Sequence, residues 1–180
     1  LCLFVENDQD LTDLINMLNL RYHFIMSFKA LNEFIQKGIF HNQNVYAKIA
    51  DIFLPLLASN GVFILSDVTS KSDNSRKFYP ELMNEGINDL VREYIKPHSC
   101  VPVLYKSIMP IACFYNEERC EGCYMQDIFT VTHSRKKMDK TKVAYRIICN
   151  ADFAFSIMSN MKQNNCRAVN RFADKFAPYR

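Results

Sequence analysis

Glycine is scarce in this sequence, and tryptophan is absent: the 180 residues include four glycines and no tryptophan. None of the four falls in a G-x-G-x-x-G or G-x-x-x-x-G-K-[ST] pattern, in which glycines let a backbone loop approach phosphate groups. The sequence therefore excludes a phosphate-cradling loop from this chain.

Long apolar runs are also missing. The longest candidate, residues 49–65, is interrupted by Asp51, Pro55 and Asn60, whereas a membrane-spanning helix needs ~18 or more apolar residues in succession. A basic segment followed by a small-residue cleavage site, the pattern of a secretory signal, is not visible. We expect an intracellular protein of the cytoplasm or the mitochondrial matrix, with no membrane partner.

The composition is that of a folded domain. Hydrophobic residues make up 49% of the chain and charged residues 23%, and the net charge is +3. These values exclude extensive disorder, and the charge is too small to identify a nucleic-acid-binding protein by itself. The chain opens directly on an apolar run, residues 1–5. We therefore expect an amino-terminal segment, or a partner chain, to supply the rest of the fold.

The first half alternates between strand-like and helix-like patterns. Strands are expected at residues 1–5, 22–28 and 62–65, and helices around 11–18, at 30–36 and at 42–57, with Asn60-Gly61 as a helix stop and turn. The run 62–65 is continuously apolar, so we expect it to be buried on both faces. Alternating strands and helices predict an α/β fold with a parallel sheet.

The second half has a different character. A helix is expected at residues 79–94, and two strands at 128–132 and 143–149 form a predicted hairpin with a polar turn at 135–140. Apolar residues at helical spacing predict further helices from Ala151 onward: Phe153, Ile157, Met161, Phe172 and Phe176. We divide the chain into an α/β domain, 1–150, with a Cys-rich insertion at 97–124, and a C-terminal helical extension, 151–180.

This order of elements resembles the second half of class I S-adenosylmethionine-dependent methyltransferases, whose last two strands form an antiparallel pair at the sheet edge. The passage Leu54–Asp67, LPLLASNGVFILSD, is similar to the passage around the fifth strand of that family. The resemblance covers residues 1–150 and implies a Rossmann-like methyltransferase sheet with a terminal antiparallel hairpin. The family's glycine-rich first motif, which holds the methionine part of the cofactor, is absent from this sequence.

A narrower resemblance is to methyltransferase-like proteins of ribosomal small-subunit assembly. It is carried by residues 29–34, KALNEF, and by the cysteine-containing stretch 110–126. This resemblance implies RNA or a ribosomal subunit as partner. It also favours an iron–sulfur cluster over zinc.

Cofactor-binding residues are expected where the parallel strands end, because ligands bind beyond the carboxyl ends of strands in open α/β sheets. These candidates are Asn7, Asp8, Ser27 and Phe28. The resemblance implies that Asp8 accepts the adenine amino group, and Phe28 would stack on or cover the ring. The alternative for Asp8 is a turn or a helix cap. For Asp67 a helix cap or a loop position is the preferred interpretation.

Asn32 and Glu33 are the candidate catalytic residues, because the helix that follows Phe28 begins beside the expected substrate mouth. A carboxylate there would position an amine or act as a base. The alternative is a solvated helix face with Leu31 and Phe34 buried.

Four of the seven cysteines lie in the insertion. The candidate metal ligands are Cys100, Cys113, Cys120 and Cys123. The last two form a C-x-x-C pair, whose spacing lets two thiolates bind one metal. Four thiolates suit zinc or a [4Fe–4S] cluster. Three alternatives remain open: Cys149 or His133 as the fourth ligand, a catalytic Cys123–His133 pair, and cysteines scattered in the core.

Basic residues gather around 135–142 and in 161–180. With the interleaved aromatic residues they form a candidate RNA footprint, and the alternative is a set of solvated loop tips and helix faces. The leading hypothesis is a methyltransferase that uses S-adenosylmethionine. The alternative is a catalytically inactive, metal-stabilised assembly factor of the same fold that binds RNA or protein.

Overall fold

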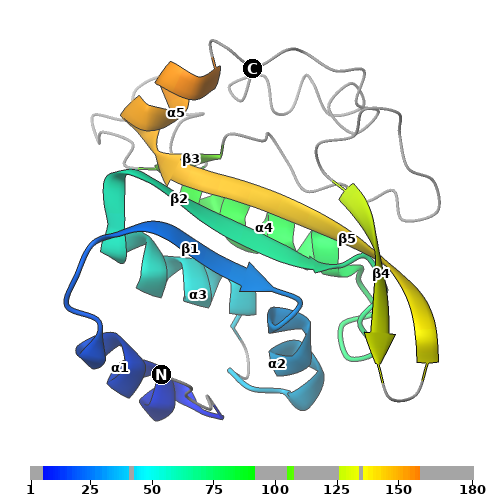
Figure 1. Ribbon diagram of the computed structural model, residues 1–180. Helices are drawn as coiled ribbons and strands as arrows, with labels where there is room; N and C mark the ends of the chain where they lie inside the picture. Colours follow the sequence, from blue (N-terminus) through cyan, green and yellow to red (C-terminus); the bar gives the residue numbers. More distant parts are fainter. Residues whose placement is uncertain (1–5, 41–42, 92–104, 108–125, 134–135, 159–180) are drawn as a thin grey trace.

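A computed structural model of the chain describes residues 6–40, 43–91, 105–107, 126–133 and 136–158 (Figure 1). Its elements in order are α1 Asp8–Met17, β1 Tyr22–Phe28, α2 Leu31–Lys37, α3 Val45–Phe53, the 3₁₀ helix η1 Leu54–Leu56, β2 Leu57–Val68, α4 Tyr79–Val91, β3 Tyr105–Ser107, β4 Gln126–His133, β5 Lys136–Asn150 and α5 Ala151–Met158. The predicted strand 1–5 lies outside the described residues, as does the chain beyond Met158. Of the Cys-rich insertion 97–124 the structure describes residues 105–107, which form β3. In the part of the chain that the structure describes, no helix is long and apolar enough to cross a membrane.

The five strands form one open, mixed sheet. Its order is β1-β2-β5-β3, and β4 also pairs with β5. Strands β1 and β2 are parallel, whereas β5 runs antiparallel to β2, β3 and β4. The α/β class is confirmed, and so is an antiparallel pair, β4 and β5, near the end of the described chain. The prediction of a parallel sheet holds for β1 and β2 and is wrong for the other described pairings.

The hairpin strands are longer than predicted, and the polar stretch 136–140 belongs to β5 instead of a turn. There Thr130 pairs with Lys140 and Val131 pairs with Asp139. Lys137 and Lys140 are exposed, so their polarity does not oppose a strand. Polar composition was therefore a misleading turn signal here.

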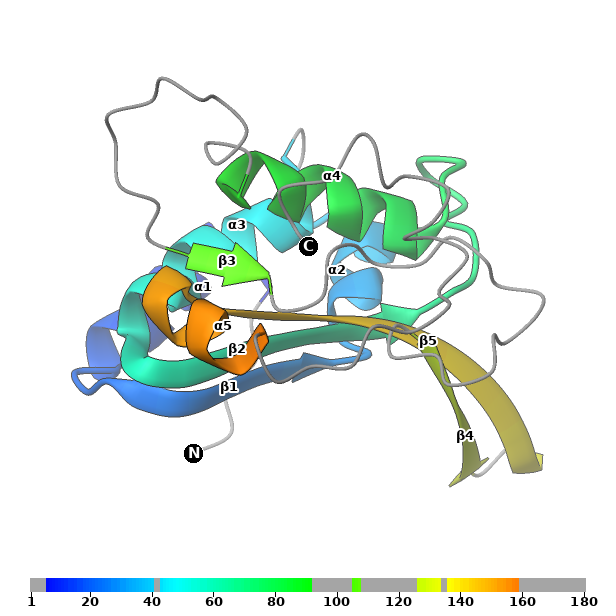
Figure 2. The ribbon, with the colours of Figure 1, turned by 90° about the horizontal axis from the view of Figure 1, so that it is seen from above.

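The main core lies between the sheet and the helices of one face. Figure 2 shows α3 and α4 side by side over that face. Phe63 and Leu65 of β2 project into the core and meet Ile49 of α3 and Met83 and Ile87 of α4, and all five side chains are buried.

Helix α3 ends earlier than predicted. The expected helix 42–57 is resolved into α3, Val45–Phe53, and the 3₁₀ turn η1, which contains Pro55 near its start. Proline has no backbone N–H to continue the α-helical bonding, so the chain changes to the tighter turn and then enters β2.

Asn60-Gly61 forms a bulge within β2, not the predicted stop and turn before a strand. Tyr22 pairs with Leu57 but Phe24 pairs with Val62, so β2 accommodates extra residues over this interval. A Cβ atom on Gly61 would lie 2.7 Å from the carbonyl oxygen of Tyr22. Only glycine lets the two backbones approach this closely.

The two faces of β2 differ in burial. Phe63 and Leu65 are buried, whereas Val62 and Ile64 are half-buried. The expectation that residues 62–65 are buried on both faces is therefore wrong for the described part of the chain. The helices α3 and α4 cover one face, and α5 covers only one end of the other.

Candidate functional site

The parallel strands β1 and β2 end side by side. Phe28 pairs with Ser66, and the backbone N–H of Lys29 donates to the Ser66 carbonyl oxygen at 2.8 Å. Lys29 adopts a positive φ of 51°, a left-handed conformation that is uncommon for a residue with a side chain. This turn redirects the chain from β1 into α2, which begins at Leu31.

Asp67 is the polar centre of this region. Its carboxylate is fully buried at the end of β2. Oδ2 accepts from the Asn32 backbone N–H and from the Tyr46 hydroxyl, each at 2.8 Å. Oδ1 accepts from the Val68 backbone N–H at 2.8 Å. The carboxylate therefore ties strand β2 to the start of α2 and to α3.

Asp67 also serves as a cap for α2 from a distant part of the chain. The local N-cap residue, Ala30, offers no side-chain hydrogen bond, and the first N–H groups of a helix need an outside acceptor. The interpretation of Asp67 as a helix cap is confirmed, although the capped helix lies earlier in the sequence. The signal was invisible locally because the partners are 35 residues apart.

Burial controls the ionisation of this carboxyl. Desolvation raises the pKa of Asp67 from 3.8 to about 6, against the opposing effect of the hydrogen bonds from Val68, Tyr46 and Asn32 and of the Lys29 charge. Burial, followed by the neighbouring Asp67 charge, holds the pKa of Tyr46 well above its usual value. Tyr46 is therefore a protonated donor at neutral pH, and Asp67 titrates just below neutrality.

The candidate catalytic residues lie at the start of α2. With its amide nitrogen facing the available acceptors, Asn32 donates to Asp67 Oδ1 at 2.8 Å and to the Lys29 carbonyl oxygen at 3.1 Å. Its side chain thus holds the Asp67 carboxylate and the turn at Lys29 in place. Glu33 is exposed in the first turn of α2, where a negative charge interacts favourably with the helix dipole. Leu31 is buried.

Asn7 caps α1. Its side-chain oxygen accepts from the Gln9 and Asp10 backbone N–H groups at 2.8 and 3.1 Å, and the Asp10 carboxylate accepts from the Asn7 N–H at 3.1 Å. The cap considered for Asp8 thus belongs to Asn7, while Asp8 is the first residue of α1. The N-x-x-D spacing of a capping box was the available signal.

Ser27 and Phe28 stand on opposite faces of the sheet, because neighbouring side chains alternate along a strand. Ser27 is half-buried, and Phe28 is 44% exposed. The structure therefore does not direct these two candidate cofactor residues into one site.

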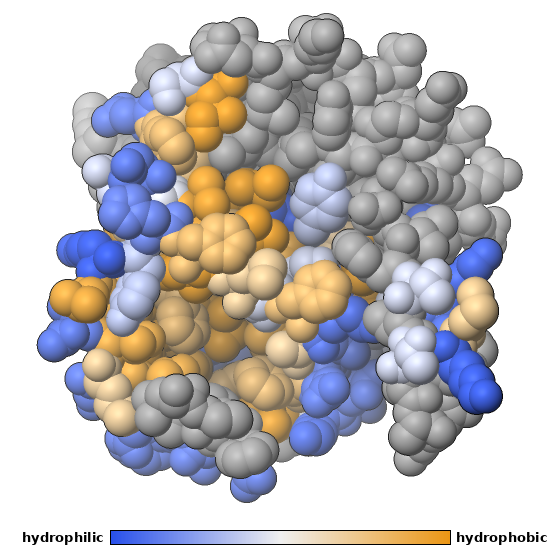
Figure 3. Space-filling view, in the orientation of Figure 1, coloured by the Kyte–Doolittle hydropathy of each residue, from blue (hydrophilic) through white to orange (hydrophobic). Residues whose placement is uncertain are grey.

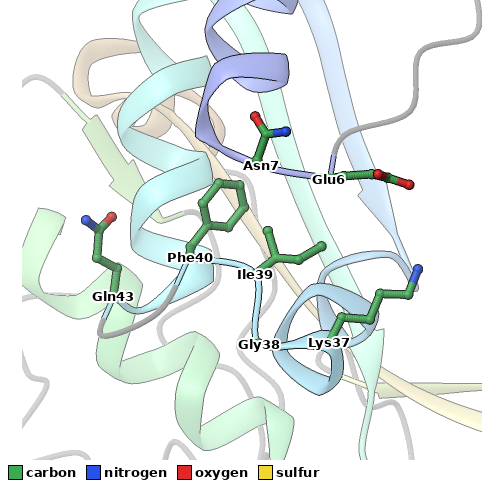
Figure 4. A pocket seen from close by; sticks show the side chains of 7 residues that line it. All are labelled: Glu6, Asn7, Lys37, Gly38, Ile39, Phe40 and Gln43. Carbon is green, nitrogen blue, oxygen red and sulfur yellow. The ribbon is translucent and has the colours of Figure 1, made fainter.

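A cavity of about 460 Å³ lies between the start of α1 and the connection from α2 to α3 (Figure 4). Its lining residues are Glu6, Asn7, Lys37, Gly38, Ile39, Phe40 and Gln43. The Phe40 ring points from the connection toward the start of α1, Glu6 and Lys37 lie at one end, and Gln43 lies at the other. This volume is in the range of small-molecule sites.

Two backbone features shape the cavity. Gly38 is the C-cap of α2 in the left-handed conformation, with φ 67°, and Phe40 also has a positive φ, 62°. The Phe40 ring is held edge-to-face against Phe34 with the ring centroids 5.9 Å apart. Of the cavity residues, sequence reasoning found Asn7. Gly38 after a basic residue was the signal for the helix end, but nothing local marked a cavity.

The candidate metal ligands Cys100, Cys113, Cys120 and Cys123 lie outside the described residues, and so does the Cys123 of the alternative Cys123–His133 pair. Among the residues that the structure describes, no group of three His, Cys, Asp or Glu side chains could hold a metal ion. Cys149 is a buried free thiol, and burial raises its pKa to about 11. A protonated thiol is a poor metal ligand and a poor nucleophile.

Sequence reasoning missed Arg146, which lies in the middle of β5. The side chain is fully buried, and its guanidinium donates to the Asn84 side-chain oxygen of α4 at 3.2 Å. The apolar run around it predicted a strand but not the role of the one charged residue within it.

No protein-family model matches the sequence, and neither the curated proteins nor the solved structures contain a match.

Proposed function

We propose that the chain forms the carboxyl-terminal part of a Rossmann-like methyltransferase domain that uses S-adenosylmethionine as methyl donor. One observation carries the proposal: the parallel strands β1 and β2 are followed by an antiparallel strand, β5, which lies between β2 and the hairpin strand β4. An antiparallel pair of strands at the edge of the sheet, here β4 and β5, is what the resemblance to class I methyltransferases implies.

The cavity beside Asn7 supports an adenosine site. The half-buried Ile39 offers apolar surface for a purine ring beside the edge of Phe40, which is 8% exposed, and the Glu6 carboxylate is an acceptor for hydroxyl or amino groups. The Asn7 oxygen is occupied by the α1 cap, so its amide nitrogen is the group that would donate to a purine nitrogen. These residues fit the nucleoside part of the cofactor.

This chain has no glycine-rich loop to hold the methionine part of S-adenosylmethionine. S-adenosylmethionine supplies a methyl group on a positively charged sulfur, and the protein must align that carbon with an acceptor. We assign two roles to this chain. It binds the nucleoside part of the cofactor, and Asp67, Asn32 and Tyr46 fix the ends of β1 and β2.

Titration calorimetry with S-adenosylhomocysteine tests the proposal. Asn7→Ser keeps a side-chain acceptor for the α1 cap, because serine is a good N-cap residue, but it removes the amide nitrogen. We expect the wild-type chain to bind and Asn7→Ser to weaken binding about tenfold, the loss of one hydrogen bond. Asn19→Ser, the same change at an exposed position beyond α1, is the matched control.

Two results would count against the proposal. A wild-type chain that does not bind S-adenosylhomocysteine at millimolar concentration contradicts the cofactor assignment. If Asn7→Ser, Asn19→Ser and the wild type bind S-adenosylhomocysteine with equal affinity, the cofactor binds somewhere other than this cavity.

The second candidate function is a catalytically inactive, RNA-binding form of the same fold. Two observations favour it: the Asn32 amide is committed to Asp67 and Lys29, and the hairpin exposes Lys137 and Lys140. Phosphate contacts make binding fall steeply with salt. Salt-dependent RNA binding that Lys137→Gln/Lys140→Gln weakens, in a chain that binds no S-adenosylhomocysteine, would favour this function.

A further inference from the structure

The Asp67 carboxylate has its hydrogen-bonding capacity filled. Oδ2 accepts from the Asn32 backbone N–H and from the Tyr46 hydroxyl, and Oδ1 accepts from the Val68 backbone N–H, each at 2.8 Å. The side-chain nitrogen of Asn32 is the fourth donor, also at 2.8 Å from Oδ1. An ionised carboxylate offers about four lone-pair sites. A proton that binds Asp67 must therefore displace one of these donors.

Asp67 lies on the side of the sheet that the helices cover. The other side is apolar: Figure 3 shows hydrophobic residues gathered over the strands there, and Phe24 of β1 is 57% exposed. On the helix side, Asn32 and Lys29 are half-buried, whereas Tyr46 is 1% exposed. Of these three neighbours of Asp67, Asn32 and Lys29 are therefore the two that meet water.

The titratable and charged groups around Asp67 and its partners come from four parts of the fold. They are Lys29 of the β1–α2 turn, Tyr46 of α3, Tyr79 of α4 and Arg146 of β5, which bonds to Asn84 of α4. Tyrosine, lysine and arginine side chains ordinarily change charge only well above pH 7. The pKa of Asp67 is about 6, so Asp67 is the member of this group that titrates between pH 5 and pH 7.

Two of the four donors can change from donor to acceptor. The Tyr46 hydroxyl could accept from a protonated Asp67, but its own hydrogen would then need another acceptor inside the core, and a buried donor without a partner is costly. The Asn32 amide carries an oxygen and a nitrogen on one carbon. If the amide turns over, its oxygen takes the position 2.8 Å from Asp67 Oδ1. The NH₂ group can then bond to water, because Asn32 is half-buried.

Turning the amide also changes the connection between β1 and α2. The Asn32 nitrogen donates to the Lys29 carbonyl oxygen at 3.1 Å, which supports a residue in the left-handed conformation, with φ 51°. Such a conformation persists only where surrounding contacts hold it. With the amide turned over, two acceptor oxygens would face each other, and this supporting hydrogen bond would be lost.

We propose that Asn32 is a proton-controlled switch: protonation of Asp67 turns the Asn32 amide over, so that Asn32 accepts from Asp67 and releases the Lys29 carbonyl at the ends of β1 and β2. The switch requires neither methyl transfer nor a ligand in the cavity, because it follows from the donors that surround Asp67.

Solvent exchange of side-chain NH₂ hydrogens, measured by NMR on the ¹⁵N-labelled full chain at pH 5 and pH 7.5, tests the proposal. Asn19 is exposed and is the reference, because dividing by its rate removes the direct effect of pH on exchange. At pH 7.5 the Asn32 hydrogens are bonded to Asp67 and Lys29, and at pH 5 they face water. Asn32 should exchange about tenfold more slowly than Asn19 at pH 7.5, and within about threefold of it at pH 5.

The variant Asp67→Asn removes the charge and supplies a permanent donor in place of the protonated carboxyl. Asn32 should then exchange within about threefold of Asn19 at both pH values. Asp51→Asn makes the same change at an exposed position of α3 and should keep the wild-type dependence on pH.

Three results would contradict the switch. The first is a ratio of Asn32 to Asn19 exchange that is the same at pH 5 and pH 7.5 in the wild type, a measurement that needs no variant. The second is a pH-dependent ratio that persists in Asp67→Asn, because another group would then drive the change. The third is simultaneous loss of protection at the backbone amide of Ile49, which is buried in α3, because local unfolding would then expose Asn32.

Discussion

Replacing Tyr46 with phenylalanine tests the polar centre at the end of β2. The Tyr46 hydroxyl donates to Asp67 Oδ2 at 2.8 Å, and both side chains are buried. Phenylalanine keeps the ring and its packing but removes the donor. A hydrogen bond to a charged group contributes about 1.5–3 kcal/mol to stability. We expect Tyr46→Phe to lower the free energy of unfolding by this amount at pH 8, where Asp67 is ionised.

The loss of stability caused by Tyr46→Phe should depend on pH. In the wild type the pKa of Asp67 rises from 3.8 to about 6 on folding, so the folded state holds its proton more tightly than the unfolded state. Stability through this group is therefore greatest below pH 4, falls as the pH rises to about 6, and is flat above that. The difference between these two pKa values, at ~1.4 kcal/mol per pKa unit, corresponds to a loss of about 3 kcal/mol in the free energy of unfolding between low and high pH.

Removing the hydroxyl withdraws one donor from the ionised carboxylate and raises the pKa of Asp67 further. The cost of Tyr46→Phe should consequently be larger at pH 8 than at pH 4.5, where the neutral carboxyl makes a weaker bond of about 1 kcal/mol. Urea unfolding followed by far-ultraviolet circular dichroism at the two pH values measures both costs. Tyr22→Phe is the control, because the half-buried Tyr22 hydroxyl makes no hydrogen bond within the described residues. A cost below about 0.5 kcal/mol at pH 8, or equal costs at both pH values, would refute this reasoning.

Two further predictions concern the bulge in β2 and the cysteines. Gly61→Ala should destabilise the chain by about 1–3 kcal/mol, because its Cβ would lie 2.7 Å from the Tyr22 carbonyl oxygen. Ser59→Ala, at an exposed position in the same bulge, should change the urea midpoint little, and equal midpoints of the two variants would contradict the close approach. The chain, purified without oxygen, should contain stoichiometric zinc or show an iron–sulfur absorption band at ~400 nm. The variant Cys120→Ser/Cys123→Ser should lose the metal or the band. A folded, colourless and metal-free wild type would contradict the metal site.

Local sequence patterns predicted the helices and strands whose apolar residues recur at a regular spacing. The apolar run Tyr22–Phe28 became β1 with the same bounds. The two apolar stretches near the end became parts of β4 and β5, but 128–131 pairs with the polar residues 139–142, and 143–149 pairs with β2. Such elements need only a periodic apolar face to be recognised. The class of fold followed from their alternation with helices.

The features that the sequence analysis missed depend on partners far away in the chain. Asn60-Gly61 looked like a turn because the strand that requires its glycine, β1, lies more than 30 residues earlier. The contacts of Asp67 with Asn32 and Tyr46 span 35 and 21 residues. The cavity beside Asn7 arises from two left-handed residues after α2, and of these only Gly38 belongs to a recognisable pattern. Physical contact between distant segments, not local propensity, created each of these features.

We propose that the chain binds the nucleoside part of S-adenosylmethionine between α1 and the α2–α3 connection. The most direct measurement is photocrosslinking with an 8-azidoadenosine analogue of the cofactor, followed by peptide mapping of the labelled chain. We expect the label to fall on the cavity residues Glu6, Asn7 or 37–43 and excess S-adenosylhomocysteine to suppress it. Label elsewhere in the chain, or label that S-adenosylhomocysteine does not suppress, would contradict it.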